Sequence, residues 1–91
     1  MATGTPVAAG SGNVHVVTGA TTLVGVAFRE TAAAVATFAL RDGTTTGDPI
    51  RFAGNLAASA FNYVALPAVP FTTGVFLNRQ SGTTELVLYF T

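Results

Sequence analysis

The sequence predicts an all-β protein, a small antiparallel β-sandwich of about seven or eight short strands. Three observations predict this fold class. Short segments rich in Val, Thr and Phe recur along the chain, and turn-forming Gly, Pro, Asp and Asn separate them. Several of these segments alternate in polarity, which is the period of a strand. The 91 residues provide for one core, and no repeat of about 20–50 residues indicates a solenoid or a propeller.

The first half of the chain contains three predicted strands, which span residues 13–18, 21–30 and 35–41. The second strand places Val24, Val26 and Phe28 on one face. In the third strand the two faces alternate, with Ala36, Phe38 and Leu40 toward the core and Thr37, Ala39 and Arg41 outward. The alanines favour a competing helix over residues 30–39, because alanine is the best helix former. Val, Thr and Phe in the same run favour a strand with an irregular start at residues 31–33.

The second half begins with a predicted loop. Residues 42–49 (DGTTTGDP) contain Asp-Gly and Gly-Asp-Pro turn signals. Further short strands are expected at residues 50–52 and 61–66. Residues 55–60 are ambiguous and are compatible with a helical turn. Pro67 and Pro70 predict an irregular stretch, because proline is excluded from the central strands of a sheet.

The C-terminal segment predicts a β-hairpin. Residues 73–80 and 83–90 flank Ser81-Gly82, which is a good two-residue turn signal. The last strand is apolar on both faces, with Leu86, Leu88 and Phe90 on one and Val87 and Tyr89 on the other. Such a strand is either central in a sandwich or covered by a partner.

Residues 1–12 (MATGTPVAAGSG) predict an extended N-terminal arm, followed by a sandwich domain of residues 13–91. The small residues of the arm have little to bury, so the arm alone should be disordered, and we expect a neighbouring subunit to order it. The segment also lacks the basic and apolar regions of a signal peptide. The residues expected at protein–protein interfaces lie in the arm, in the loop of residues 67–73 and in the last strand: Thr5, Pro6, Val7, Phe71, Val87 and Tyr89.

The charge content is unusually low. Charged residues make up 9% of the chain, against about 25% in a typical soluble domain, and the formal net charge is zero. Lysine is absent, and threonine, with fifteen copies, supplies much of the polarity. A surface of this kind suits an interface, although a codon bias against lysine explains the same composition. Four arginines make no basic stripe for nucleic acid, and no apolar run approaches the about 20 residues of a membrane span.

The few residues able to do chemistry form no recognisable motif. His15 lies mid-strand without a nucleophile motif such as G-x-S-x-G, and cysteine is absent. Asp42 and Asp48 flank a loop that could hold calcium, but they fall short of a calcium-binding loop and suit hydrogen bonds within their own turns better. Glu30 and Glu85 offer two carboxylates without a sugar cleft, and serve better as rim charges or cross-strand partners. We therefore expect no enzyme, no cofactor, no metal and no small-molecule substrate.

The chain resembles a group of small β-sandwich virion proteins of tailed bacteriophages that infect actinobacteria. The resemblance rests on turn-and-strand motifs beyond residue 20: ETA (30–32), LRDG (40–43), GDP (47–49), PFTTGV (70–75) and SGT (81–83). It implies a capsid decoration (cement) protein that is made in the bacterial cytoplasm and lies on the capsid surface of the virion. Its partners would be the major capsid protein and further copies of itself. The alternatives are a minor tail, fibre or head–tail connector protein, or a small module that binds host-surface glycans.

Overall fold

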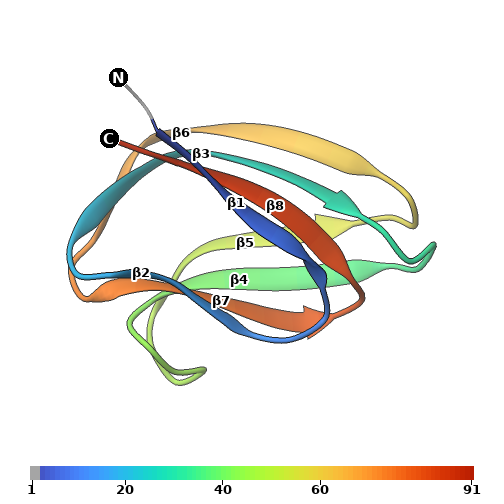
Figure 1. The fold of residues 1–91 in the computed structure, drawn as a ribbon, viewed down its shortest axis with the longest axis horizontal. Coiled ribbons are helices and arrows are strands. Elements are labelled where there is room, and N and C mark those ends of the chain that lie inside the picture. The colour runs from blue at the N-terminus through green and yellow to red at the C-terminus, as the bar shows by residue number, and fades with distance from the viewer. Residues whose placement is uncertain (1–2) are drawn as a thin grey trace.

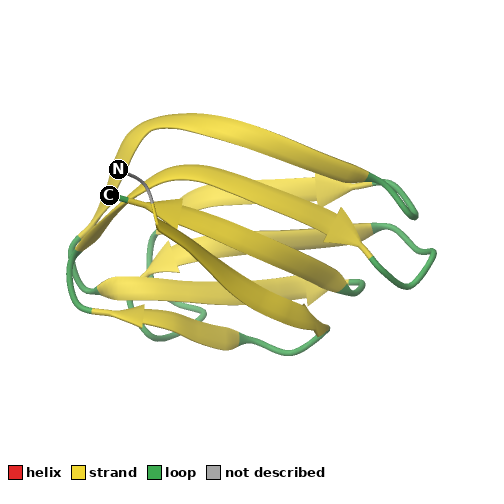
Figure 2. Ribbon diagram, turned by 45° about the horizontal axis from the view of Figure 1, so that its top comes forward, coloured by secondary structure: helices red, strands yellow, loops and turns green. Residues whose placement is uncertain are grey.

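The computed structural model describes residues 3–91 as two four-stranded antiparallel sheets packed face to face, with no helix among them (Figures 1 and 2). This architecture confirms the predicted all-β sandwich. Residues 3–91 contain no helix that could cross a membrane. The eight strands are β1 (Thr3–Gly10), β2 (Val14–Thr18), β3 (Thr21–Glu30), β4 (Ala36–Asp42), β5 (Ile50–Leu56), β6 (Phe61–Phe71), β7 (Gly74–Ser81) and β8 (Thr84–Phe90).

The strand order identifies the sandwich as an eight-stranded jelly roll. Sheet A has the order β1-β8-β3-β6, and sheet B has the order β2-β7-β4-β5. The chain thus pairs its first strand with its last, its second with its seventh, its third with its sixth and its fourth with its fifth. A ribbon paired in this way and rolled up gives the two Greek keys of a jelly roll. All connections except β4–β5 therefore cross from one sheet to the other.

The core lies between the sheets and follows from the alternation within each strand. Leu23, Val26 and Phe28 point inward from β3, and Phe38 points inward from β4. The rings of Phe28 and Phe38 meet edge to face across the two sheets, with their centroids 5.0 Å apart. Gly54 on β5 lies against the Phe38 ring, where a Cβ atom would clash. Gly54 is the β5 residue that pairs with Phe38, so the Phe38 ring lies over β5 only because Gly54 has no side chain.

The predicted N-terminal arm is instead an edge strand of the protein's own sheet. β1 pairs with β8 along most of its length, and Val7 is buried in the core. The expectation that a neighbouring subunit orders this segment is therefore wrong for Thr3–Gly10, because β8 of the same chain does so. Met1 and Ala2, which belong to the predicted arm, lie outside the described residues.

The predicted C-terminal hairpin is also wrong. β7 belongs to sheet B and β8 to sheet A, so the chain crosses between the sheets at Gly82 instead of turning back within one. Gly82 has a φ of +74°, and a Cβ atom there would lie 2.6 Å from the Val35 carbonyl oxygen. Glycine is needed for this crossing as much as for a tight hairpin turn, which is why the sequence signal is the same.

Of the other local predictions, some are confirmed and some are wrong. β4 begins at Ala36 after an irregular stretch, so the strand interpretation of this region is confirmed and the helical alternative is excluded. Residues 55–60 finish β5 and form a turn, without helix. β6 continues through Pro67 and Pro70, because it is an edge strand and needs no donor on its free side. Its pairing with β3 is irregular where Ala68 has a φ of +62°.

The pairing irregularity also changes which side chains of β3 face the core. The registers of β3 with β6 and with β8 both shift between Leu23 and Gly25. Leu23 and Val26 are therefore both fully buried in the core, whereas Val24 is only half-buried and lies outside the core cluster. The prediction that Val24 shares the inward face of Val26 is wrong, because a bulge adds one residue to the strand.

Candidate functional site

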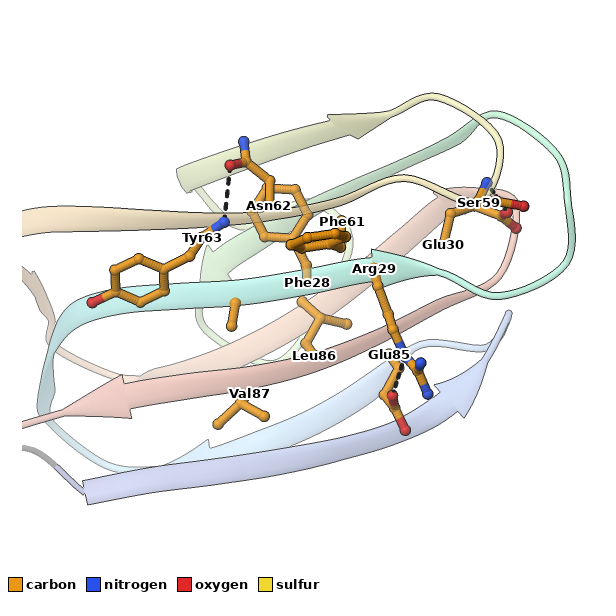
Figure 3. Close-up of a pocket in the computed structure, with 11 residues that line it drawn as sticks. Phe28, Arg29, Glu30, Ser59, Phe61, Asn62, Tyr63, Glu85, Leu86 and Val87 are labelled. Atoms are coloured by element: carbon orange, nitrogen blue, oxygen red, sulfur yellow. Dashed lines mark hydrogen bonds and ion pairs between the residues drawn. The ribbon is translucent and has the colours of Figure 1, made fainter.

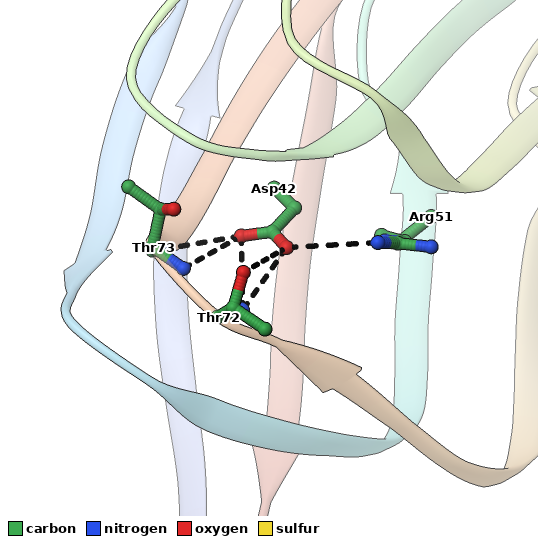
Figure 4. A network of polar contacts seen from close by, with 5 residues as sticks. Asp42, Arg51, Thr72 and Thr73 are labelled. Atoms are coloured by element: carbon green, nitrogen blue, oxygen red, sulfur yellow. Dashed lines mark hydrogen bonds and ion pairs between the residues drawn. The ribbon is translucent and has the colours of Figure 1, made fainter.

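Most charged side chains of this protein are bound to its own backbone, which leaves few of them for chemistry. Asp42 is the clearest example (Figure 4). Its Oδ1 accepts hydrogen bonds from the backbone N–H groups of Thr72 and Thr73, at 3.0 and 2.8 Å, and its Oδ2 accepts one from the Thr72 hydroxyl at 2.9 Å. The backbone N–H donors of Thr72 and Thr73 lower the pKa of Asp42 to about 2, against the opposing effect of burial. Asp42 thus fixes the β6–β7 crossing at the end of the sandwich where β1 begins and β8 ends.

Arg79 has the matching role at the opposite end. Its guanidinium group donates to the carbonyl oxygens of Ala8 (2.7 Å), Gly12 (3.0 Å) and Thr84 (2.8 Å). Burial lowers the pKa of Arg79. The side chain connects the end of β1, the β1–β2 crossing and the start of β8, so it holds the first strand on the domain.

Glu30 and Asp48 bind loop backbone in the same manner. Glu30 accepts hydrogen bonds from the backbone N–H groups of Ala32, Ala34 and Ser59. These donors lower the pKa of Glu30, with the largest effect from Ser59, and burial opposes them. Asp48 Oδ2 accepts from two N–H groups within its own turn, and these donors lower its pKa as well. Each carboxylate therefore stabilises a loop.

These contacts bear on the candidate chemistry of the sequence. The expectation that Asp48 bonds within its own turn is confirmed, whereas the same expectation for Asp42 is wrong, because Asp42 binds the β6–β7 crossing. Residues 3–91 contain no cluster of three or more His, Asp or Glu side chains that could hold a metal ion. His15 is exposed on β2. Glu85 forms a cross-strand ion pair with Arg29, as expected. The same expectation for Glu30 is wrong, because Glu30 is buried and binds the backbone of two loops.

The outer face of sheet A is the most distinctive surface of the molecule. Side chains from all four strands form rows across it, because the strands are in register. Gly4, Tyr89, Gly25 and Ala65 form one row; Pro6, Val87, Ala27 and Tyr63 form the next; Glu85, Arg29 and Phe61 form the third. Apart from the Arg29–Glu85 pair, these rows carry no charge, and we call the eleven residues the sheet A face.

Large aromatic side chains stand exposed on the sheet A face. Phe61 is 82% exposed and Tyr63 is 57% exposed. The rings of Tyr63 and Tyr89 meet edge to face, with centroids 6.0 Å apart. Gly25 and Gly4 make room for them, since a Cβ atom would lie 2.8 Å from the Tyr63 hydroxyl at Gly25 and 3.1 Å from the Tyr89 ring at Gly4. The glycines therefore let both rings lie close to the sheet.

A shallow depression of about 450 Å³ adjoins these rings (Figure 3). Ala27 lies in its lining, with Phe61 and Tyr63 on the β6 side and Glu85 and Val87 on the β8 side. The lining is mainly apolar, and the Arg29–Glu85 pair stands at one end. This arrangement can receive an apolar side chain or a flat ring, but it offers no nucleophile or metal site.

Sheet B presents a more polar outer face. Arg41 donates to Asn78 Oδ1 at 3.2 Å, and the hydroxyls of Thr37 and Ser81 are 2.8 Å apart. Ala39 alternates with the core residues Phe38 and Leu40 and so lies on this outer side, as expected, but its neighbours bury it fully. The two outer faces of the sandwich therefore differ in chemistry, which marks the sheet A face as the candidate contact surface.

The structure separates the predicted interface residues into two groups. Pro6, Val87 and Tyr89 lie together on the sheet A face. Thr5 and Val7 occupy the alternate positions of β1, opposite the inward-facing residues of β8. The prediction that Phe71 is an exposed anchor is wrong: Phe71 is 1% exposed, because it ends β6 with its ring in the core.

Sequence reasoning missed Phe61 and Tyr63, the most exposed aromatic residues of the face. Their odd-numbered spacing in β6 is a strand signal, but the even-numbered Val64 and Leu66 are apolar as well. Because both faces of this strand carry apolar side chains, the sequence does not show which face points into the core. Only the pairing of β6 with β3 in the folded protein fixes the inward face.

No known protein family, no curated protein and no solved structure matches this chain.

Proposed function

We propose that this protein is a structural component of a virion, a capsid decoration protein that acts through protein–protein contacts. The observation that carries the proposal is the sheet A face. It displays Phe61 and Tyr63 to solvent in a domain whose charged side chains are largely bound to its own loops. Exposed aromatic side chains at a charge-poor centre are typical of contact surfaces between proteins.

The architecture supports the same proposal at a coarser level. Jelly rolls with eight strands are common in viral capsid proteins and also in lectins. Because a fold alone does not assign a function, this likeness adds weight only together with the surface chemistry and the resemblance of the turn motifs to phage virion proteins.

The energetic argument for decoration is multiplicity. A single sheet face of this size supports a modest interface, but a closed shell repeats that interface over many copies. A small, net-neutral protein can crowd on such a shell without electrostatic repulsion between neighbours.

The test uses phage particles that lack this protein. Purified protein added to them should bind in many copies over the shell and raise the temperature at which the particles release DNA. The Phe61→Ala, Tyr63→Ala double variant should bind in fewer copies, whereas Ile50→Ala, which changes an exposed apolar residue on β5, should bind normally. Location in a ring or at the tail would favour the tail or connector alternative, and no binding would contradict a virion role.

Glycan binding is a second candidate, favoured by the exposed ring of Phe61 beside the depression. Carbohydrates stack on aromatic rings, and the Arg29–Glu85 pair provides polar groups nearby. A glycan array separates the two functions: binding of one sugar class that Phe61→Ala abolishes would favour the glycan module, and an array without binding would exclude it for the glycans displayed.

A further inference from the structure

Large and small side chains lie side by side on the sheet A face. The Tyr89 ring lies against Gly4 and the Tyr63 hydroxyl lies against Gly25, while Phe61 stands exposed at the β6 edge. The face is therefore apolar and aromatic, and the Arg29–Glu85 pair supplies its only charges. A second copy that sets opposite charges face to face can cover it without burying a charge against an apolar group.

A two-fold axis parallel to the strands, running between β3 and β8, produces this arrangement. The sheet order β1-β8-β3-β6 places that line at the centre of sheet A. Rotation by half a turn about it lays β6 of one copy over β1 of the other, and β3 over β8. Positions along the strands are unchanged, so each row of the face meets the same row of the second copy. Such an isologous contact is the commonest form of protein dimer.

The rows then match in charge. In the middle row, the β6 position of Tyr63 lies over the β1 position of Pro6 of the other copy, and Val87 lies over Ala27, which lines the depression. In the third row, Arg29 of one copy faces Glu85 of the other, because these two residues stand opposite each other on β3 and β8. Every charge on the face therefore meets its opposite, and no charge is buried against an apolar group.

We propose that the sheet A face is a self-association surface, on which a second copy of this chain packs about that two-fold axis. The charge pattern supports this occupant, because the turned copy places its Arg29 over Glu85 and its Glu85 over Arg29. The inference does not depend on the virion role. On a decorated particle the same contact would join neighbouring copies of this chain on the shell.

The size of the face sets the expected strength. Four strands about 4.8 Å apart and about seven residues long cover roughly 19 by 23 Å. Two such faces bury on the order of 900 Å², which is below the about 1,200 Å² of standard stable interfaces. We therefore expect a weak dimer, with a Kd in the micromolar range or above, that crowding at high local concentration would favour.

The experiment is sedimentation equilibrium of the purified chain from ~1 µM to ~1 mM. The native protein should pass from monomer to dimer over this range. Phe61→Asp should stay monomeric, and the matched control Ile50→Asp, on the outer side of sheet B, should dimerise as the native protein does. A monomeric native protein at every concentration, or a Phe61→Asp variant that still dimerises, would overturn the proposal.

A charge exchange tests the two-fold arrangement itself. Arg29→Glu leaves two acidic residues in the third row, and Glu85→Arg leaves two arginines there, so each variant alone should repel its own copies. An equimolar mixture should form a heterodimer with about the native Kd, because both cross-copy pairs become complementary. Neither variant retains an Arg29–Glu85 ion pair within its own chain, so only contacts between the two chains can account for dimerisation of the mixture. If the mixture stays monomeric, or if each variant dimerises alone, the proposed axis is wrong.

Discussion

Asp42, Glu30 and Arg79 show how this chain uses the few charges that it has. All three side chains point into the ends of the sandwich and bind backbone groups of segments that cross between the sheets. A crossing segment has no ladder partner for its own N–H and C=O groups, so a buried charged side chain is an efficient way to satisfy them. No buried side-chain N or O atom in residues 3–91 lacks a hydrogen-bond partner. The low charge content therefore reflects selective placement.

The Asp42 contacts predict a pH dependence of stability. The pKa of Asp42 is about 2 in the folded protein and 3.8 in the absence of these contacts. The folded state thus binds the proton less tightly than the unfolded chain, so the carboxylate stabilises the fold above about pH 4, and this contribution is lost as the pH falls toward 2. Thermal unfolding of the native protein and of Asp42→Asn is measured from pH 7 to pH 2. The variant should have a lower Tm than the native protein at pH 7, and its Tm should fall less as the pH is lowered. An equal drop in both proteins would contradict this assignment.

The guanidinium group of Arg79 predicts a large effect of a change that keeps only the apolar stem of the side chain. Arg79→Met keeps much of the apolar stem but leaves the carbonyl oxygens of Ala8, Gly12 and Thr84 without their donor. We expect a loss of about 2–3 kcal/mol in the free energy of unfolding, measured with urea. Arg29→Met, which removes only the solvent-exposed ion pair with Glu85, should change it by less than about 1 kcal/mol. A similar effect of both changes would argue against a special role of Arg79.

At the scale of elements, the connections distinguish this protein from a simple meander. Turn signals such as Ser81-Gly82 and Asp42-Gly43 look alike in the sequence, yet the first crosses between sheets and the second starts the β4–β5 hairpin. The same holds for the first strand, whose small residues resemble a flexible arm. β1 is ordered because β8 provides a partner edge and because Val7 reaches the core.

The membership of β1 in the core predicts that Val7 contributes to the stability of a single chain. Val7→Ala should lower the free energy of unfolding by about 2 kcal/mol, from lost burial and the resulting cavity. Pro6→Ala, on the outward side of the same strand, should change it by less than about 1 kcal/mol. Urea unfolding at low protein concentration measures both. If Val7→Ala has no effect under these conditions, β1 does not dock on its own domain in solution.

At the scale of the whole molecule, the two outer faces of the sandwich differ in chemistry. Side-chain hydrogen bonds connect neighbouring strands on the sheet B face. The sheet A face exposes aromatic side chains, which become more stable when another protein covers them. The formal net charge of the chain is zero, so long-range repulsion between copies does not oppose the proposed self-association through this face.

Self-association should link the stability of the molecule to its concentration. A dimer that dissociates on unfolding has a Tm that rises with protein concentration by mass action. Calorimetry at about 10 µM and about 1 mM should show this rise for the native chain and a constant Tm for Phe61→Asp. A concentration-independent Tm for the native protein would show that dimerisation adds no measurable stability in this range.

The sequence by itself determined the fold class, most strand positions and the lack of a recognisable catalytic motif. These properties follow from local patterns, because alternation, turn residues and composition act over a few positions. The tertiary structure decided which strands pair, that β1 belongs to sheet A, and that Phe71 lies inside while Phe61 lies outside. The physical reason is that strands such as β6 and β8 carry apolar residues on both faces. Their local energies barely distinguish the two orientations, and only the closure of the whole sandwich selects one.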